Sequence, residues 1–210
     1  MEKKIITISR EFGSGGRELG KRLADELGCA YYDGEIATAV AEKSGLAEQY
    51  VQSISERQFN VFPIHYGRTF EFFAAPDSNY TKMLMAQQEF LVELAEKGDC
   101  VIVGRGADKI LERYQPLSIF VYADMESKVR RCREKAPEGE NLTDKELKKK
   151  IQQVDSGRAQ YRRLFSDNKW GAKEDHQLCI NTSNMEIKAL IPSVAAYARC
   201  WFASRDIKNR

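Results

Sequence analysis

The chain has 210 residues, of which 42% are hydrophobic and 30% are charged, and its formal net charge is +2. This composition is typical of a soluble globular protein, and the length predicts a single domain over residues 1–210. A charge so close to balance gives no reason to expect nucleic acid or a membrane as a partner. The sequence contains no apolar run of the roughly 18 residues that span a membrane, and it opens without a signal peptide.

The cysteines and histidines indicate the cellular compartment and whether a structural zinc site is to be expected. The five cysteines are far apart and form no CxxC pair, and the two histidines are far apart as well. Scattered cysteines in apolar runs are typical of reduced thiols that pack as small hydrophobic groups. We therefore expect a cytoplasmic protein without a structural zinc site.

The chain begins with a strand, a glycine-rich loop and a helix. Residues 5–8 are mostly β-branched, which predicts a buried strand, and leucines spaced four apart after the loop predict a helix that stops at Gly28. A strand, glycine loop and helix in this order present backbone N–H groups and a positive helix end to a phosphate. We therefore predict phosphate-binding residues at these positions: Arg10, Gly13, Ser14, Gly15 and Gly16.

The loop departs from the strict GxxxxGK[ST] pattern. If Gly16 takes the place of the second glycine, Arg17 stands at the lysine position and Glu18 at the Ser/Thr position. If Gly15 takes that place, the lysine position holds a glycine. An ordinary glycine-rich turn between a strand and a helix is therefore the alternative, although Arg10 and Arg17 supply the charge that a phosphate needs.

An acidic residue follows the second predicted strand, residues 29–32. Asp33 would lie at the carboxyl edge of the sheet, where ligands bind in open α/β folds; it is equally suited to cap the next helix. Residues 34–58 are helical in pattern, whereas residues 59–80 are rich in aromatic side chains and have no clean period. We expect an ordered loop there, which serves either as a hydrophobic cluster or subunit contact, or as a lobe on the substrate side.

The third predicted strand, residues 100–103, leads directly into a loop with an arginine and an acid. It follows a predicted helix over residues 80–96. Arg105 offers a planar guanidinium that suits a phosphate or a carboxylate. The alternative is a structural ion pair between Arg105 and Asp108.

The rest of the chain predicts two strands, residues 117–121 and 178–180, and helices over residues 124–135, 144–165 and 185–202. The first of these helices is basic, for which a solvated face is the default and an arginine that faces phosphate is the alternative. In the second, Arg158 and Arg162 project from one helical face, so an anion or an acid must lie between them. Asp155 would be that acid; a bound polyphosphate is the functional alternative.

Five strands separated by helices predict a doubly wound, five-stranded parallel sheet flanked by helices, in the α/β class. Several segments in chain order also resemble the cytidylate kinase-like family within the P-loop nucleoside monophosphate kinases. They are ITISREFGSGGRELGKRLA with YYD after it, VIVGRGAD, the DxxRxxYRR segment, and KWG with LCINTS. The resemblance implies a P-loop kinase fold with a helical acceptor-side insertion over residues 34–80 and a lid over residues 136–165.

The resemblance also implies roles for particular residues. The glycine loop would wrap the phosphates of ATP, and Arg105 would hold the acceptor together with Asp33 and Asp108. In the family an acid follows that arginine directly, whereas in this chain the acid is displaced to Asp108.

The implied catalytic residues are Arg17, Arg158 and Arg162, of which Arg158 belongs to the DxxR pattern of the lid. The earlier Arg-Asp of that pattern is replaced by isoleucine and glutamine at residues 151–152. Mg²⁺ is the expected companion of ATP, and without the loop Ser/Thr its nearest protein ligand would be Ser14.

Two functions are compatible with these residues. The first is an ATP-dependent phosphotransferase that acts on a nucleoside monophosphate or a related small molecule, and the paired lid arginines favour it. The second is a nucleotide-binding sensor without catalysis, and the missing loop lysine favours it. Nucleic-acid binding through residues 128–150 is disfavoured because acidic residues interrupt the basic run. The aromatic stretch is suited to a subunit contact, so a homodimer is compatible with the sequence.

Overall fold

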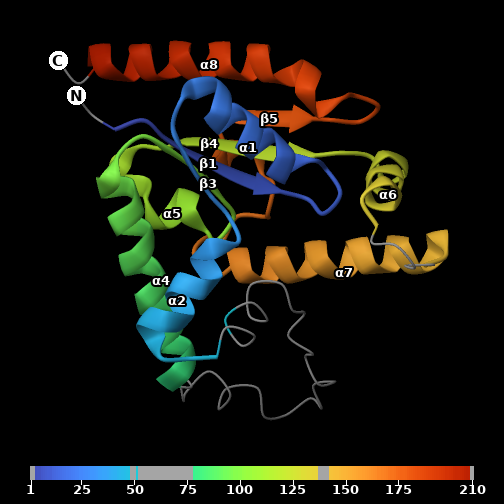
Figure 1. The fold of residues 1–210 in the computed structure, drawn as a ribbon, viewed down its shortest axis with the longest axis horizontal. Coiled ribbons are helices and arrows are strands. Elements are labelled where there is room, and N and C mark those ends of the chain that lie inside the picture. The colour runs from blue at the N-terminus through green and yellow to red at the C-terminus, as the bar shows by residue number, and fades with distance from the viewer. Residues whose placement is uncertain (1–2, 48–50, 52–77, 137–141, 209–210) are drawn as a thin grey trace.

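The computed structural model describes residues 3–47, 51, 78–136 and 142–208 (Figure 1). Its centre is a five-stranded sheet in the order β2-β3-β1-β4-β5, with every neighbouring pair parallel. This confirms the predicted α/β sheet. The strands are β1 (Ile5–Arg10), β2 (Ala30–Tyr32), β3 (Cys100–Val103), β4 (Leu117–Tyr122) and β5 (Leu178–Asn181).

Helices cover both faces of this sheet (Figure 1). The helices in the described part of the chain are α1 (Gly16–Leu27), α2 (Glu35–Ser44), α4 (Ser78–Lys97), α5 (Ala107–Ile110), α6 (Met125–Glu134), α7 (Asp144–Arg162) and α8 (Ile187–Lys208). Short 3₁₀ turns lie at Glu112–Tyr114 and Lys173–Asp175. In the described ranges, no helix combines the length and the apolar character that crossing a membrane requires.

Alternate residues of the central strand enter two separate hydrophobic cores. Ile6 and Ile8 pack with buried residues of α1 and α8, whereas Ile5 packs with α2, α4 and α5. Because helices bury both faces, the strands are nearly continuous apolar runs instead of alternating ones. This is why short β-branched runs in the sequence predict the strands well.

The helix boundaries differ from the predicted ones in a few places. Helix α5 was not predicted because four residues are too few to show a helical period, and α8 extends beyond its predicted end at residue 202. Helix α2 covers Glu35–Ser44 of the helical pattern over residues 34–58. Residues 48–50 and 52–77, with most of the aromatic stretch, lie outside the described residues.

The helix pair α6 and α7 packs beside the glycine loop. Helix α7 begins with a capping box in which Thr143 and Glu146 exchange hydrogen bonds, and it ends at Arg162, slightly before the predicted end. Val129 of α6 forms a small core with Leu147 and Ile151 of α7, and Phe12 of the glycine loop packs against the same core. The predicted lid helix is therefore in contact with the predicted phosphate loop.

Candidate phosphate-binding site

The loop between β1 and α1 has the backbone shape of an anion-binding turn. Gly13 and Gly15 have φ values of 77° and 81°, which side chains rarely adopt, and Gly15 caps the N-terminus of α1. These two positions also have no room for a side chain. A Cβ at Gly15 would lie 2.5 Å from Ile187 Cδ1, and one at Gly13 would lie 2.9 Å from the carbonyl oxygen of Lys128.

Ser14 shapes this loop from the inside. Its side chain is fully buried, its hydroxyl donates to the carbonyl of Glu11 at 2.8 Å, and its oxygen accepts from the N–H of Gly16 at 3.4 Å. The carbonyl of Ser14 accepts a further hydrogen bond from the hydroxyl of Thr182 at 2.7 Å. These bonds fix the shape of the loop, and they direct the hydroxyl of Ser14 toward the backbone.

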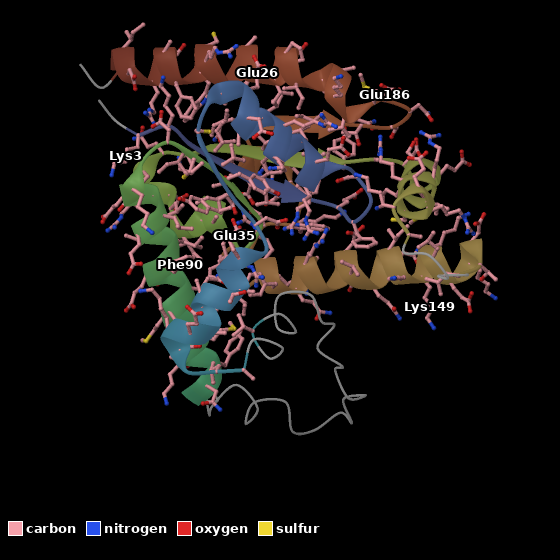
Figure 2. All side chains as sticks on the ribbon, in the orientation of Figure 1. Lys3, Glu26, Glu35, Phe90, Lys149 and Glu186 are labelled. Carbon is pink, nitrogen blue, oxygen red and sulfur yellow. The ribbon has the colours of Figure 1, made fainter. Side chains whose placement is uncertain are left out.

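A cleft of about 1190 Å³ opens over the loop. The predicted phosphate-binding residues other than Ser14 line it, and so do Arg17, Asp33 and Arg158. Arg105, predicted on the acceptor side, is not part of this lining. The opposite wall comes from α6 and α7, including Arg131, Cys132, Leu147 and Lys150. Lys149, in contrast, projects from the outer side of α7 (Figure 2).

Arg10 is the most unusual charge in this cleft. Its side chain is 15% exposed, and its one ion pair among the described residues is with Asp33, at 3.8 Å between Nη2 and Oδ1. Burial, together with the positive charges of Arg158, Arg17 and Arg105, lowers the pKa of Arg10 to about 9, although Asp33 acts in the opposite direction. The guanidinium makes no hydrogen bond within the described part of the chain. It is therefore a buried cation whose carboxylate partner, Asp33, is distant and is shared with Arg17.

Asp33 lies between two arginines at the carboxyl edge of the sheet. Besides Arg10, it pairs with the Nε of Arg17, whose side chain is 65% exposed, and the hydroxyl of Tyr31 donates to it at 3.3 Å. Burial, followed by the charge of Asp33, raises the pKa of Tyr31. Helix α2 is capped by Gly34 without a side-chain hydrogen bond, so the alternative that Asp33 caps this helix is wrong.

The loop after β3 brings Arg105 close to Arg10. Gly104, Arg105 and Gly106 all have positive φ values, of 79°, 61° and 64°. A Cβ at Gly104 would lie 2.0 Å from Nη1 of Arg10, so only glycine permits this approach. The side-chain amide of Gln87 holds the turn by donating to the carbonyl of Arg105 at 2.9 Å.

The two predicted lid arginines lie in different surroundings. Arg158 lines the cleft, donates to the carbonyl of Arg10 at 3.0 Å, and lies over the ring of Phe12 at 5.7 Å. Arg162 is 3% exposed and pairs with Asp108 at 2.7 Å and with Asp175 at 3.3 Å.

This placement corrects two expectations from the sequence. Arg162 and Asp108 do not line the cleft, because the C-terminal end of α7 is buried against α5 and the turn at Lys173–Asp175. The acid that was expected between the two arginines, Asp155, instead accepts from the N–H of Phe12 and pairs with Lys128. Two arginines on one face of α7 therefore lie in different environments, Arg158 in the cleft and Arg162 in a buried cluster of acids.

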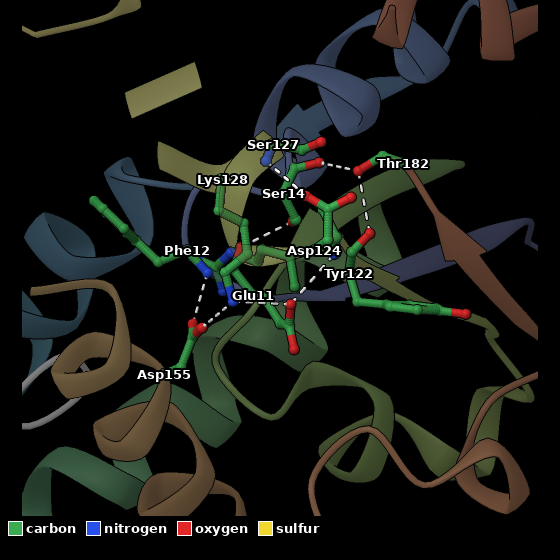
Figure 3. A network of polar contacts seen from close by, with 12 residues as sticks. Glu11, Phe12, Ser14, Tyr122, Asp124, Ser127, Lys128, Asp155 and Thr182 are labelled. Atoms are coloured by element: carbon green, nitrogen blue, oxygen red, sulfur yellow. Dashed lines mark hydrogen bonds and ion pairs between the residues drawn. The ribbon is translucent and has the colours of Figure 1, made fainter. Parts of the chain in front are cut away.

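Sequence reasoning missed two buried cations of the basic helix α6. Lys128 bonds to Glu11 and Asp155 (Figure 3). Arg131 donates to the carbonyls of Thr182 and Met185. Burial, then the charge of Arg130, lowers the pKa of Arg131. The two residues are three apart and so share a helical face, but the same spacing occurs among the exposed charges of this helix.

The candidate site fits phosphate groups better than it fits a preformed metal centre. Among the described residues, no group of three or more histidine, cysteine, aspartate or glutamate side chains could hold a metal ion. Glu11 and Asp155, two acids in contact with the loop, are engaged by Lys128. An Mg²⁺ ion here would depend mainly on phosphate oxygens, as Mg²⁺ in kinases commonly does.

The strand order, the glycine loop after β1 and the arginine-lined cleft define a P-loop kinase fold. The family model described as the cytidylate kinase-like family matches residues 5–184, and the chain belongs to that family. No curated protein matches the chain by sequence.

Solved structures show the same fold. An uncharacterized protein from Eubacterium ventriosum is 24% identical, with a TM-score of 0.69, and the match covers 94% of this chain and 99% of the other. Shikimate kinase from Bacteroides thetaiotaomicron is 16% identical, with a TM-score of 0.55 and coverage of 93% and 98%. A gluconokinase from Sinorhizobium meliloti is 12% identical, with a TM-score of 0.54 and coverage of 100% and 98%.

Proposed function

We propose that this protein is an ATP-dependent phosphotransferase that moves the γ-phosphoryl group of ATP to a nucleoside monophosphate or a related small phosphorylated molecule. Membership of the cytidylate kinase-like family supports a nucleotide-dependent kinase. The acceptor class is our proposal, and it rests on the number and position of the arginines in the cleft.

The observation that carries this proposal is the charge around Arg10. Three further arginines lower its pKa, and among the described residues Asp33 is the one carboxylate that counteracts them. Such a cluster is costly in the free protein and favourable once a multiply charged anion binds. Its position beside Gly13 and Gly15 matches a polyphosphate whose oxygens accept from the backbone of the loop.

The acceptor would bind on the side of Asp33 and Arg105. Both residues follow the carboxyl end of a strand, and β2 and β3 are neighbours in the sheet. Arg10 lies between this side and the glycine loop, because it touches Gly104 and pairs with Asp33. It would therefore lie between the donor and acceptor phosphates. The insertion over residues 34–80 would complete the acceptor side.

Phosphoryl transfer needs positioning and neutralisation of charge more than a covalent catalyst. Arg158, on α7, lies across the cleft from α1 and is the best candidate to contact the transferring group. Arg17, at the lysine position, would neutralise phosphate oxygens after leaving Asp33. Mg²⁺, when bound with ATP, would shield the β- and γ-phosphates.

A nucleotide-binding sensor is the second candidate function. One observation favours it: Arg17, which stands at the lysine position of the loop, extends toward Asp33 and is largely exposed. The loop also has Glu18 where a Ser/Thr would bind Mg²⁺. Such a protein would bind ATP without turning it over.

A coupled assay of ADP release separates the two functions. Mg-ATP is supplied with a panel of nucleoside monophosphates and small alcohols, and ATP binding is measured in parallel. We expect turnover with at least one phosphorylated acceptor. ATP binding without turnover on any acceptor would overturn the phosphotransferase in favour of the sensor.

A further inference from the structure

The carboxylate of Asp155 bridges the glycine loop and helix α6. Asp155 Oδ1 accepts from the backbone N–H of Phe12 at 2.6 Å, and Asp155 Oδ2 accepts from Lys128 Nζ at 2.8 Å (Figure 3). A backbone N–H of a glycine loop and a lysine ammonium are the two kinds of donor that P-loops offer to phosphate. In this structure both of them bind a side chain of the lid helix.

The lysine donor is held in place independently of Asp155. Glu11 Oε2 accepts from Lys128 Nζ at 3.0 Å and from the N–H of Ala123 at 3.3 Å, which ties the lysine to the ends of β1 and β4. The backbone of Lys128 also lies against Gly13, where a Cβ would clash with its carbonyl oxygen. The ammonium would therefore remain beside the loop if Asp155 moved away.

Lys128 carries the positive charge that a phosphate needs, and its side chain is shielded from solvent. Its side chain is 6% exposed. Burial lowers its pKa, but hydrogen bonds and charges from Asp155 and Glu11 outweigh burial, so that the pKa is raised overall. With Arg17 turned toward Asp33, Lys128 is the one buried lysine in the described part of the chain, and it lies beside the loop.

We propose that the N–H of Phe12 and the ammonium of Lys128 form a phosphate subsite, which the carboxylate of Asp155 occupies in the nucleotide-free protein. The inference rests on the proposed function, and it gives Lys128 the task of the missing loop lysine. Carboxylate and phosphate are both anionic acceptors, so the same donors serve either. Glu11, Phe12 and Gly13 line the cleft, which puts the subsite at its edge.

Replacement of the Asp155 carboxylate by a phosphate would also affect how helix α7 is held. A polyphosphate that enters the subsite must displace Asp155, and α7 then loses its polar link to Phe12. Arg158 lies one turn further along the same helix, and its bond to the carbonyl of Arg10 is a second polar link, which remains. Binding of the donor phosphates would thus loosen the segment of α7 that carries Arg158, and Arg158 could then exchange the carbonyl of Arg10 for the nucleotide.

The first test is the affinity of the full chain for sodium tripolyphosphate, measured by calorimetry without Mg²⁺. In Asp155→Asn the amide keeps the size of the side chain but loses its charge, so it competes less well with phosphate. We expect the variant to bind tripolyphosphate about three- to tenfold more tightly than the wild type, the effect of weakening one charged contact. Asp25→Asn is the matched control, because Asp25 also lines the cleft but lies on α1. It reports the general gain from removing one negative charge, and we expect that gain to be smaller.

The second test removes the ammonium. Lys128→Met should weaken tripolyphosphate binding by roughly tenfold or more, and Lys128→Arg should retain most of it. Lys149→Met, on the outer side of α7, is the control with the same loss of charge. If Lys128→Met fails to fold because Glu11 and Asp155 are left unpaired, Lys128→Met combined with Asp155→Asn supplies the missing comparison.

The outcomes separate the inference from the proposed function. A wild-type protein that does not bind tripolyphosphate contradicts the phosphate site, and the proposed function fails with it. If the wild type binds but Asp155→Asn binds equally or more weakly, Asp155 is a structural brace and the inference is overturned, whereas the phosphate site stands. A gain no larger than that of Asp25→Asn overturns the inference as well. Tighter binding by Asp155→Asn with weaker binding by Lys128→Met supports it.

Discussion

Replacing Arg10 with methionine tests the charge distribution of the cleft. The pKa of Arg10 falls from 12.5 to about 9, which corresponds to roughly 5 kcal/mol at about 1.4 kcal/mol per pH unit. A guanidinium stays protonated in proteins, so this figure is an upper limit on the energetic cost that the free protein bears. Methionine removes the charge and keeps an apolar stem beside Gly104.

We expect Arg10→Met to raise the free energy of unfolding of the ligand-free protein by about 1–3 kcal/mol, as when apolar side chains replace other buried charges. The lost pair with Asp33 subtracts little, because its atoms are 3.8 Å apart and Arg17 still neutralises the carboxylate. Urea denaturation in a buffer without phosphate measures this change. Tripolyphosphate at one hundred times its Kd should add about 2.7 kcal/mol to the stability of the wild type, and much less to that of the variant.

Arg199→Met is the matched control, because Arg199 is an exposed arginine on α8 that pairs with Glu26 outside the cleft. It should leave both the stability and the response to tripolyphosphate nearly unchanged. An Arg10→Met protein that is less stable than the wild type, and that tripolyphosphate stabilises just as strongly, would refute the reasoning. Arg10 would then be a structural residue whose charge the fold already satisfies.

Three further substitutions distinguish the remaining arginines. Arg158→Ala should lower kcat and kcat/KM together, by up to roughly 10³-fold, and leave ATP affinity nearly intact; a tenfold loss of ATP affinity, about 1.4 kcal/mol, would indicate a sensor instead. Arg105→Ala should raise the KM of the acceptor far more than that of ATP in steady-state assays, and equal losses would assign Arg105 to the donor or to the fold. Arg162→Met should destabilise the protein by about 3–5 kcal/mol in urea denaturation, because it leaves the buried Asp108 without its arginine and takes from Asp175 one of its two cationic partners. An Arg162→Met protein of normal stability with impaired turnover would return Arg162 to the catalytic site.

The sheet and the loop were predictable because each depends on local sequence. Ile5, Ile6 and Ile8 are buried on both faces of β1, and such a strand needs only a short β-branched run. Gly13 and Gly15 have positive φ values that favour glycine. The position of Asp33 at the end of a parallel strand also followed from topology alone, since these ends meet at one edge of the sheet.

The partners of the charged residues were not predictable, because they depend on how distant helices pack. Lys128 and Lys149 are both lysines on basic helices, yet one is buried against the glycine loop and the other is exposed. Arg158 and Arg162 share a helical face in the sequence, but the end of α7 is covered by α5, a helix too short to leave a periodic signal. Charge spacing shows which side chains can meet on one helix, and only the tertiary fold shows what they meet.

Phosphoryl transfer in the arginine-lined cleft is tested directly by incubating the wild-type protein with Mg-ATP that carries a radiolabelled γ-phosphate, together with each nucleoside monophosphate in turn, and separating the products. We expect label to appear on one or more acceptors, and we expect Arg158→Ala to slow this transfer while ATP still binds. Label that stays on ATP with every acceptor, in a protein that binds ATP, would contradict it.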